Sequence, residues 1–195
     1  MKRFPILPLV VALAACGGGE PAEEAASGEP ADSAARATAA APSSEMTVPD
    51  WMHVDEANGT VHLTITAGAT EAKNYWNFNG AHDGNMRITV PVGYTVTIDF
   101  VNQDPNMAHS LGIVAQTSGF SATPDPTPVF EGAITQNPGS MTDATMPGET
   151  ETVTFVAATA GEYGMVCFVP GHAATGMYVY FDVSAAGQAG VQGAM

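Results

Sequence analysis

The segment from Cys167 to Met177 carries residues whose types and spacing can do chemistry. Cys167, His172 and Met177 follow one another with four residues between each pair, so a thiolate, an imidazole and a thioether lie close together in the chain. Soft sulfur ligands together with imidazole suit copper. A plane of two histidines and one cysteine, with a weak axial methionine, makes a blue-copper site. The segment therefore offers three of the four ligands that such a site needs.

His109 is the candidate for the missing imidazole. It follows the loop 102–108 and stands at the start of a predicted strand. In a β-sandwich, this loop can lie at the same end as the loop 167–177. We therefore expect one copper ion per chain, held by His109, Cys167, His172 and Met177. The other histidines lack a sulfur partner and are predicted to be surface or strand residues: His53, His62 and His82.

Taken alone, each of these residues has an ordinary explanation. A cysteine is most often a buried small hydrophobe, a methionine most often fills a core, and a single surface histidine usually has no special role. The chain has two cysteines, and Cys16 lies near its start. If Cys16 is lipidated, Cys167 is the only thiol of the folded domain and an internal disulfide is impossible. The joint pattern then favours a metal site.

The elements that would position these ligands are short strands. Alternation of apolar and polar residues, with frequent Gly, Pro and Asn-Gly turn signals, predicts an all-β domain of seven or eight strands, a sandwich or barrel without helices. The predicted strands are 61–66, 75–78, 86–90, 94–101, 109–115, 150–157, 162–168 and 177–183. Residues 116–147 contain five prolines and several glycines, and we expect a long loop or short extended pieces there.

The stretch 161–181 resembles the copper loop of the cupredoxins, and within that family it is most similar to sulfocyanin, with features of the rusticyanin group. Residues 77–80, 98–102 and His109 resemble earlier landmarks of the family, and the resemblance covers about 61–184. It implies an eight-stranded Greek-key sandwich with one mononuclear type 1 copper. It also implies electron transfer to or from a membrane respiratory complex, through a partner such as a terminal oxidase or a cytochrome.

One position departs from the common cupredoxin pattern. Many cupredoxins have Asn after the first histidine ligand, where it ties the two ligand loops together, whereas this chain has Ser110, as in the similar rusticyanin group. A serine hydroxyl can still form a hydrogen bond there. The residues that support the ligands would then differ, and with them the reduction potential.

The first fifty residues predict export and attachment to a membrane. Lys2 and Arg3 precede a short apolar run, and Leu-Ala-Ala-Cys16 resembles the lipobox of bacterial lipoproteins. We expect four parts: a signal peptide 1–15, a lipidated and disordered Ala/Glu/Pro/Gly-rich tether 16–50, a cupredoxin domain 51–184 and a flexible tail 185–195. The protein is expected outside the cytoplasm, anchored on the periplasmic side of an inner or outer membrane or on the cell surface.

Charge and motifs exclude several function classes. After removal of the signal, three basic residues face twenty acidic ones, a formal charge of −17, so no basic patch exists for nucleic acid. Val166 and Phe168 flank Cys167, whereas multicopper oxidases and copper nitrite reductases need histidine beside that cysteine. We therefore expect a monomeric electron carrier and no enzyme. A periplasmic protein that stores or delivers copper is the alternative, because the chain is somewhat rich in methionine.

The surroundings of His172 also predict where the electron leaves. Apolar residues flank it in the sequence: Phe168, Val169, Pro170, Ala173 and Ala174. We expect the ring edge of His172 at the surface inside a small apolar patch, with His109 lying deeper.

Overall fold

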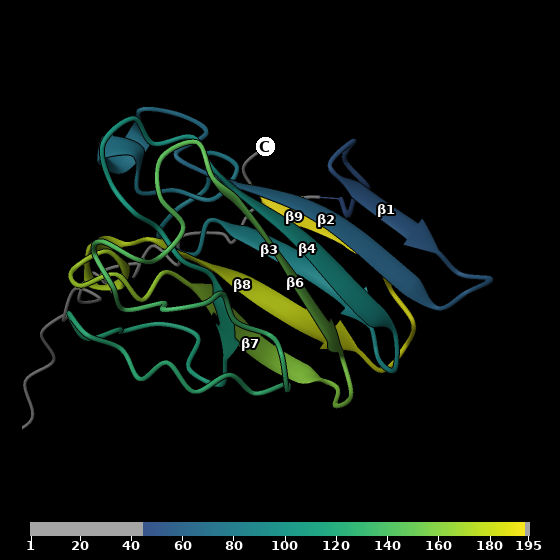
Figure 1. Cartoon of the computed structure of the whole chain (residues 1–195). Helices are drawn as coiled ribbons and strands as arrows, with labels where there is room; N and C mark the ends of the chain where they lie inside the picture. Colours follow the sequence, from purple (N-terminus) through teal and green to yellow (C-terminus); the bar gives the residue numbers. More distant parts are fainter. Residues whose placement is uncertain (1–44, 194–195) are drawn as a thin grey trace, which may run out of the picture. The chain divides into compact units, whose positions relative to one another are not determined.

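The computed structural model describes residues 45–193 as a sandwich of two β-sheets (Figure 1). One sheet has the strand order β1-β2-β4-β6 and the other has the order β5-β7-β8-β3-β9. The described residues contain two 3-10 turns, η1 (Ala72–Tyr75) and η2 (Ala173–Thr175), and no α-helix. The strands are β1 (Met52–Asp55), β2 (Thr60–Ala67), β3 (Met86–Pro91), β4 (Thr95–Asn102), β5 (Gly112–Val114), β6 (Thr150–Val156), β7 (Gly161–Val166), β8 (Tyr178–Ser184) and β9 (Gly190–Gly193). The predicted all-β sandwich is confirmed.

The core lies between the two sheets because the strands alternate as a pleated surface requires. In β2, β4 and β8 every second residue is buried. The buried residues of these strands point to one face, since successive side chains alternate across a strand. Leu63 and Phe100 from one sheet and Phe181 from the other are among the largest side chains in this core. Strands β2 and β4 pair in parallel, as do β3 and β8, so both sheets are mixed.

Seven of the eight predicted strand segments are strands, and the structure adds two more. The additions are β1 and β9, which lie at the edges of their sheets. The prediction of a strand at 75–78 is wrong, because Lys73, Asn74 and Tyr75 have positive φ angles of 54°, 60° and 67° and turn the chain there. Such left-handed residues are uncommon outside turns, and a sequence pattern of alternating polarity does not reveal them.

The predicted flexible tail 185–195 is also wrong in part. Residues of β9 pair antiparallel with β3, and Thr47 forms an isolated bridge with Val191. The folded unit therefore begins a few residues before 51 and continues past 184, because the edge of β3 offers backbone partners to β9. The signal peptide and most of the tether, including Cys16, lie outside the described residues. Within residues 45–193, no helix has the length and apolar character needed to cross a membrane.

The segment 116–147 is a long connection without a strand of its own, as expected. Isolated bridges join Gly112 to Ile134, and His109 to Thr145, just before this segment ends. Phe130 and Ala133 pack into the core. The segment thus folds back along the strand that follows His109 and helps to fix that residue.

Candidate metal centre

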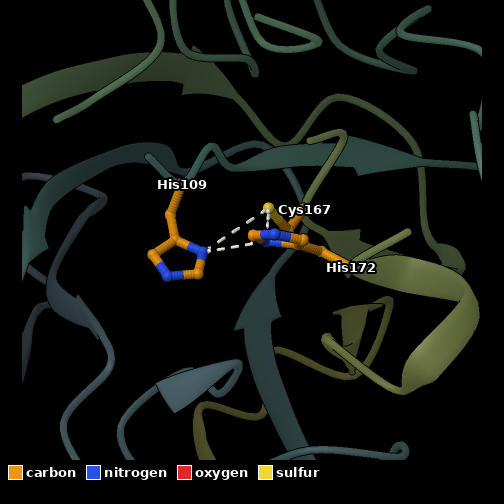
Figure 2. A group of neighbouring side chains, drawn as sticks. All are labelled: His109, Cys167 and His172. Atoms are coloured by element: carbon orange, nitrogen blue, oxygen red, sulfur yellow. Dashed lines mark hydrogen bonds between the residues drawn. The ribbon is translucent and has the colours of Figure 1, made fainter. Parts of the chain in front are cut away.

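Three of the predicted ligands meet in one buried cluster. The two Nδ1 atoms of His109 and His172 lie 3.1 Å apart, and the Cys167 Sγ lies 3.9 Å from the first and 3.5 Å from the second (Figure 2). All three side chains are fully buried. The atoms that face one another are those through which histidine and cysteine can hold a metal ion. Among the described residues, this is the only group of its kind.

The loop between β7 and β8 places two of these ligands. Cys167 follows the last residue of β7, and His172 caps the N-terminus of η2. The Cys167 N–H donates to the Met177 carbonyl at 3.2 Å, and the Met177 N–H donates to the His172 carbonyl at 2.9 Å. Gly176 has φ 112°, and a Cβ there would overlap the Asp83 carboxylate, so the tight loop needs glycine at that position.

Met177 directly precedes β8 and is fully buried. Its backbone hydrogen bonds connect it to Cys167 and His172, the two ligands of the same loop. The backbone of Met177 is therefore tied to both ligands of this loop, and its role as the axial ligand stays a prediction.

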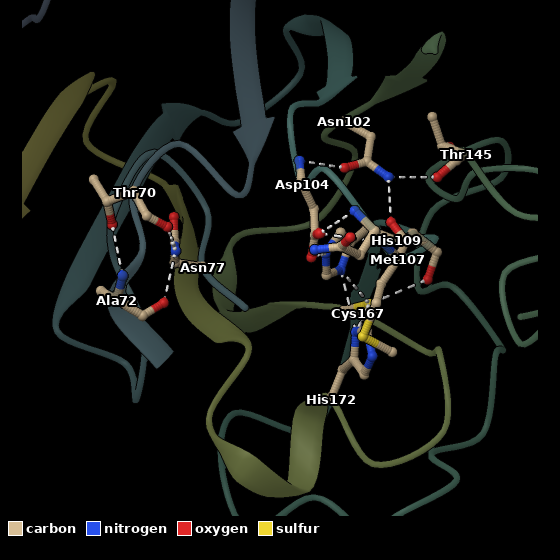
Figure 3. A network of polar contacts seen from close by, with 12 residues as sticks. Thr70, Ala72, Asn77, Asn102, Asp104, Met107, His109, Thr145, Cys167 and His172 are labelled. Atoms are coloured by element: carbon tan, nitrogen blue, oxygen red, sulfur yellow. Dashed lines mark hydrogen bonds and ion pairs between the residues drawn. The ribbon is translucent and has the colours of Figure 1, made fainter. Parts of the chain in front are cut away.

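His109 reaches the cluster from the other ligand loop. Its N–H donates to the Thr145 carbonyl at 3.0 Å, which fixes the backbone. Its Nε2 lies 2.9 Å from the Asp104 Oδ2, and both side chains are buried (Figure 3). A carboxylate accepts hydrogen bonds, so this contact places the proton of neutral His109 on Nε2 and leaves the Nδ1 lone pair facing the cluster.

Ser110 joins the two ligand loops, as expected for the position that is Asn in many cupredoxins. Its Oγ accepts a hydrogen bond from the Phe168 N–H at 2.9 Å and lies 3.7 Å from the Cys167 Sγ. The hydroxyl therefore holds the backbone beside Cys167 and contacts the sulfur itself. Hydrogen bonds to a ligand sulfur tune a copper site.

The expectation of a surface-exposed His172 is wrong. Its ring is buried and stacks on Trp76, with ring centroids 4.1 Å apart and an angle of 20° between the planes. Of the apolar neighbours expected at the surface, Phe168, Val169 and Ala173 are buried as well, whereas Pro170 and Ala174 are exposed. The physical reason is the turn at η1, which brings Trp76 from the β2–β3 connection over the ring. Within residues 45–193 the His172 Nε2 has no hydrogen-bond partner.

Burial sets the protonation of the cluster. It raises the pKa of the Cys167 thiol to about 11 and lowers the pKa of His172 to about 4. Burial also lowers the pKa of His109, although the Asp104 carboxylate opposes this shift. At neutral pH, both imidazoles are neutral and ready to bind metal, whereas Cys167 must lose a proton when a metal binds.

The donor set fits a type 1 copper ion. Two neutral imidazole nitrogens and one cysteine sulfur converge in a buried space, and a methionine is fixed next to them. This is the combination that suits copper among the biological transition metals. The remaining histidines lie elsewhere, since His62 contacts Asp99 and His82 contacts Asp83.

Two residues near the cluster were not identified from the sequence. Asp104 has a weak signal, because an acidic residue in a loop beside a candidate ligand is a plausible partner for its ring. Trp76 has no signal in the sequence that links it to the site, because it lies 33 positions before His109 in a segment predicted as a strand. Only the three-dimensional structure brings it to His172.

Comparison with known proteins agrees with a type 1 copper site. Residues 49–190 match the sulfocyanin (SoxE) domain family. The sulfocyanin of Sulfolobus acidocaldarius is 30% identical over 133 residues, which cover 66% of this chain and 65% of that protein. A rusticyanin of Acidithiobacillus ferrooxidans is 29% identical over 120 residues, which cover 61% of this chain and 73% of the rusticyanin. The chain thus spans just under two thirds of the sulfocyanin that it matches.

A solved structure shows the same fold. A crystal structure of a rusticyanin mutant at 1.5 Å superposes with a TM-score of 0.51 and 24% identity, over 69% of this chain and 88% of the rusticyanin. The arrangement of the two sheets is therefore that of a cupredoxin.

Proposed function

The chain belongs to the sulfocyanin family of cupredoxins, and we propose that it carries single electrons through one type 1 copper ion on the outer side of a membrane. The observation that carries the proposal is the convergence of the His109 Nδ1, the His172 Nδ1 and the Cys167 Sγ, each pair within 3.9 Å, in a fully buried space. Copper bound there supplies a centre that gains and loses one electron.

The side chains have distinct roles in this proposal. His109, Cys167 and His172 would hold the metal through two imidazole nitrogens and one sulfur, and Met177 would supply the fourth, weaker ligand. Cys167 and Met177 border strands β7 and β8, whose pairing fixes their separation. Because these residues are held by strand ends, by Asp104 and by Trp76, we expect the site to change little in geometry between oxidation states. A small change of geometry favours fast electron transfer.

Reconstitution with Cu(II) tests the proposal. The protein should turn intensely blue and titrate reversibly with one electron, because the colour arises from charge transfer between thiolate sulfur and copper. The Cys167→Ser variant should lose the blue band, since a hydroxyl oxygen cannot supply it. The His62→Ala variant is the matched control, because His62 lies on β2 with Asp99 as its partner and should leave the colour unchanged. A blue Cys167→Ser protein would contradict the assignment.

The lipid anchor is part of the same proposal. The lipobox at Cys16 and the acidic, proline-rich segment that follows support attachment through a tether, with a membrane respiratory complex as partner. In cells, a Cys16→Ser variant should move from the membrane fraction to the soluble extracytoplasmic fraction with its copper site unchanged. A variant that stays in the membrane fraction would refute lipidation at this residue.

Storage or delivery of copper has less support. Three of the methionines that suggested it, Met52, Met86 and Met165, are buried in the sandwich core. Their role is packing, and they do not form an array that could pass Cu(I) along a surface.

A further inference from the structure

Asp104 is a buried carboxylate next to the copper ligand cluster. Its side chain is 2% exposed, and its Oδ2 lies 2.9 Å from the Nε2 of His109, which is fully buried. A buried carboxylate is costly unless donors satisfy it. The structure supplies these donors: the Oδ1 accepts hydrogen bonds from the N–H groups of Asn106 at 2.8 Å and Met107 at 3.2 Å. The acceptor-only, ionised form satisfies all three contacts.

The surroundings hold Asp104 in place from several sides. The Asn102 Oδ1 accepts a hydrogen bond from the Asp104 N–H at 2.9 Å, and the Asn102 amide donates to the carbonyls of Met107 and Thr145 (Figure 3). A Cβ at Gly68 would lie 2.7 Å from the Asp104 nitrogen, so the end of β2 packs tightly against this loop. The carboxylate therefore cannot move away from His109 when the charge of the site changes.

No basic side chain neutralises this carboxylate within residues 45–193. The two basic residues of that range are Lys73 and Arg87, which form ion pairs with Asp83 and Asp182. Within the described residues, the Asp104 carboxylate therefore acts on His109 without a basic side chain to offset its charge. It does so through the hydrogen bond between its Oδ2 and the His109 Nε2. Among the residues that the structure describes, His172 has no such partner, and its ring contacts Trp76.

We propose that Asp104 is a positioning residue that fixes the ring of His109 and lowers the reduction potential of the copper centre; this rests on the proposed function. A hydrogen bond from a metal-binding histidine to a carboxylate orients the ring and makes the ligand nitrogen more basic. A fixed negative charge in a buried site also favours Cu(II) over Cu(I), because the more positive ion gains more from it. Both effects act in the same direction.

The test is the Asp104→Asn substitution, which keeps the size of the side chain and removes the charge. Changes in residues that support metal ligands typically alter metal affinity 10- to 100-fold. We expect the ratio of Cu(II) to Cu(I) affinity to fall about tenfold, which corresponds to a rise in potential of about 59 mV for one electron. The blue band should remain, because Cys167 is unchanged. Redox titration and separate Cu(I) and Cu(II) competition assays measure the effect.

Asp99→Asn is the matched control. Asp99 also lies 2.9 Å from a histidine Nε2, that of His62, but this pair is partly exposed and away from the ligand cluster. The control removes the same charge from the molecule and should leave the potential unchanged. An equal rise in both variants, or an unchanged potential in a blue Asp104→Asn protein, would overturn the proposal.

A second measurement covers the case in which the Asp104→Asn variant does not fold. In the parent protein loaded with Cu(I), ¹⁵N NMR should find the His109 proton on Nε2 and protected from exchange with solvent. A proton that exchanges rapidly, or that is absent from Nε2, would refute the role of Asp104. Failure of the proposed function looks different, because the parent protein itself would then give no blue Cu(II) form.

Discussion

The two histidines of the cluster, His109 and His172, are equally buried, but their rings contact different kinds of residue. Both rings are fully buried, and their Nδ1 atoms face each other at 3.1 Å. On the far side of its ring, His109 meets a carboxylate that backbone donors and Asn102 hold in place. His172 instead stacks on the indole of Trp76. One ring is fixed by a hydrogen bond to a charge and the other by contact with an aromatic face.

We expect the surroundings of the two histidines to affect different properties of the site, the reduction potential and the release of copper. We expect the carboxylate next to His109 to affect the reduction potential of a bound copper ion, and the indole next to His172 to affect the rate at which copper is released. Burial without a polar partner makes protonation of His172 more costly than that of His109, whose pKa the Asp104 carboxylate partly supports. Variants on the two sides should therefore affect different measurements.

The largest expected effect is the acid sensitivity of the metal-free protein. Burial lowers the pKa of His172 to about 4, whereas an unfolded chain binds this proton near pH 6.5. The unfolded state therefore binds more protons between these values, and stability is lost as pH falls from about 6.5 to about 4. For His172 the loss is roughly 3 kcal/mol at about 1.4 kcal/mol per pH unit. Urea unfolding of the apoprotein across this range measures it.

His172→Leu sharpens this test because it keeps an apolar group against Trp76 and removes the titrating ring. Its stability should change less between pH 6.5 and 4 than that of the parent apoprotein. The same slope in both proteins would show that His172 is not the source of the acid sensitivity.

Removal of the indole should have the next largest effect. Trp76→Ala deletes a partly buried ring and should cost about 2 kcal/mol of stability. A stacked ring pair contributes about 1 kcal/mol beyond its buried area, so copper release from His172 to a chelator should become about fivefold faster. Stopped-flow loss of the blue colour in the presence of a chelator measures the rate.

Trp76→Phe is the control for this variant. It keeps an aromatic face over His172 and removes an indole N–H that has no hydrogen-bond partner among residues 45–193. Its release rate should stay close to that of the parent. If the Phe variant releases copper as fast as the Ala variant, stacking is not what retains the ring.

The smallest expected effect concerns Ser110, which lies between the two sides. Ser110→Ala removes the acceptor of the Phe168 N–H, and loss of one such buried hydrogen bond costs about 1 kcal/mol. The blue band should also shift, because the hydroxyl contacts the Cys167 sulfur. Urea unfolding and the visible spectrum check both effects. Ser118→Ala, at an exposed position, should change neither.

Much of the fold could be predicted because a half-buried strand shows an alternating pattern of apolar and polar residues in the sequence. The alternation in β2 and β4 is visible in the sequence, since every second side chain must face the core. The prediction failed at Tyr75, where positive φ angles replace the expected strand, and at β9, whose short segment pairs only because the edge of β3 is near it. The failure at β9 depends on a contact between distant segments, whereas the failure at Tyr75 comes from left-handed backbone angles that an alternating pattern does not reveal.

The sequence by itself determined the chemistry of this protein. The spacing of Cys167, His172 and Met177 restricts them to one tight loop, and residue type alone makes sulfur and imidazole suitable for copper. Only the tertiary structure decided how the two histidines are supported. Asp104 approaches His109 because the ends of β2 and β4 fix its loop, and Trp76 covers His172 because left-handed residues in η1 turn it over the site. The Trp76–His172 contact joins segments far apart in the chain, and no local pattern of residues encodes it. Asp104 and His109 are only five residues apart, but their contact depends on how the tertiary structure folds the loop between them.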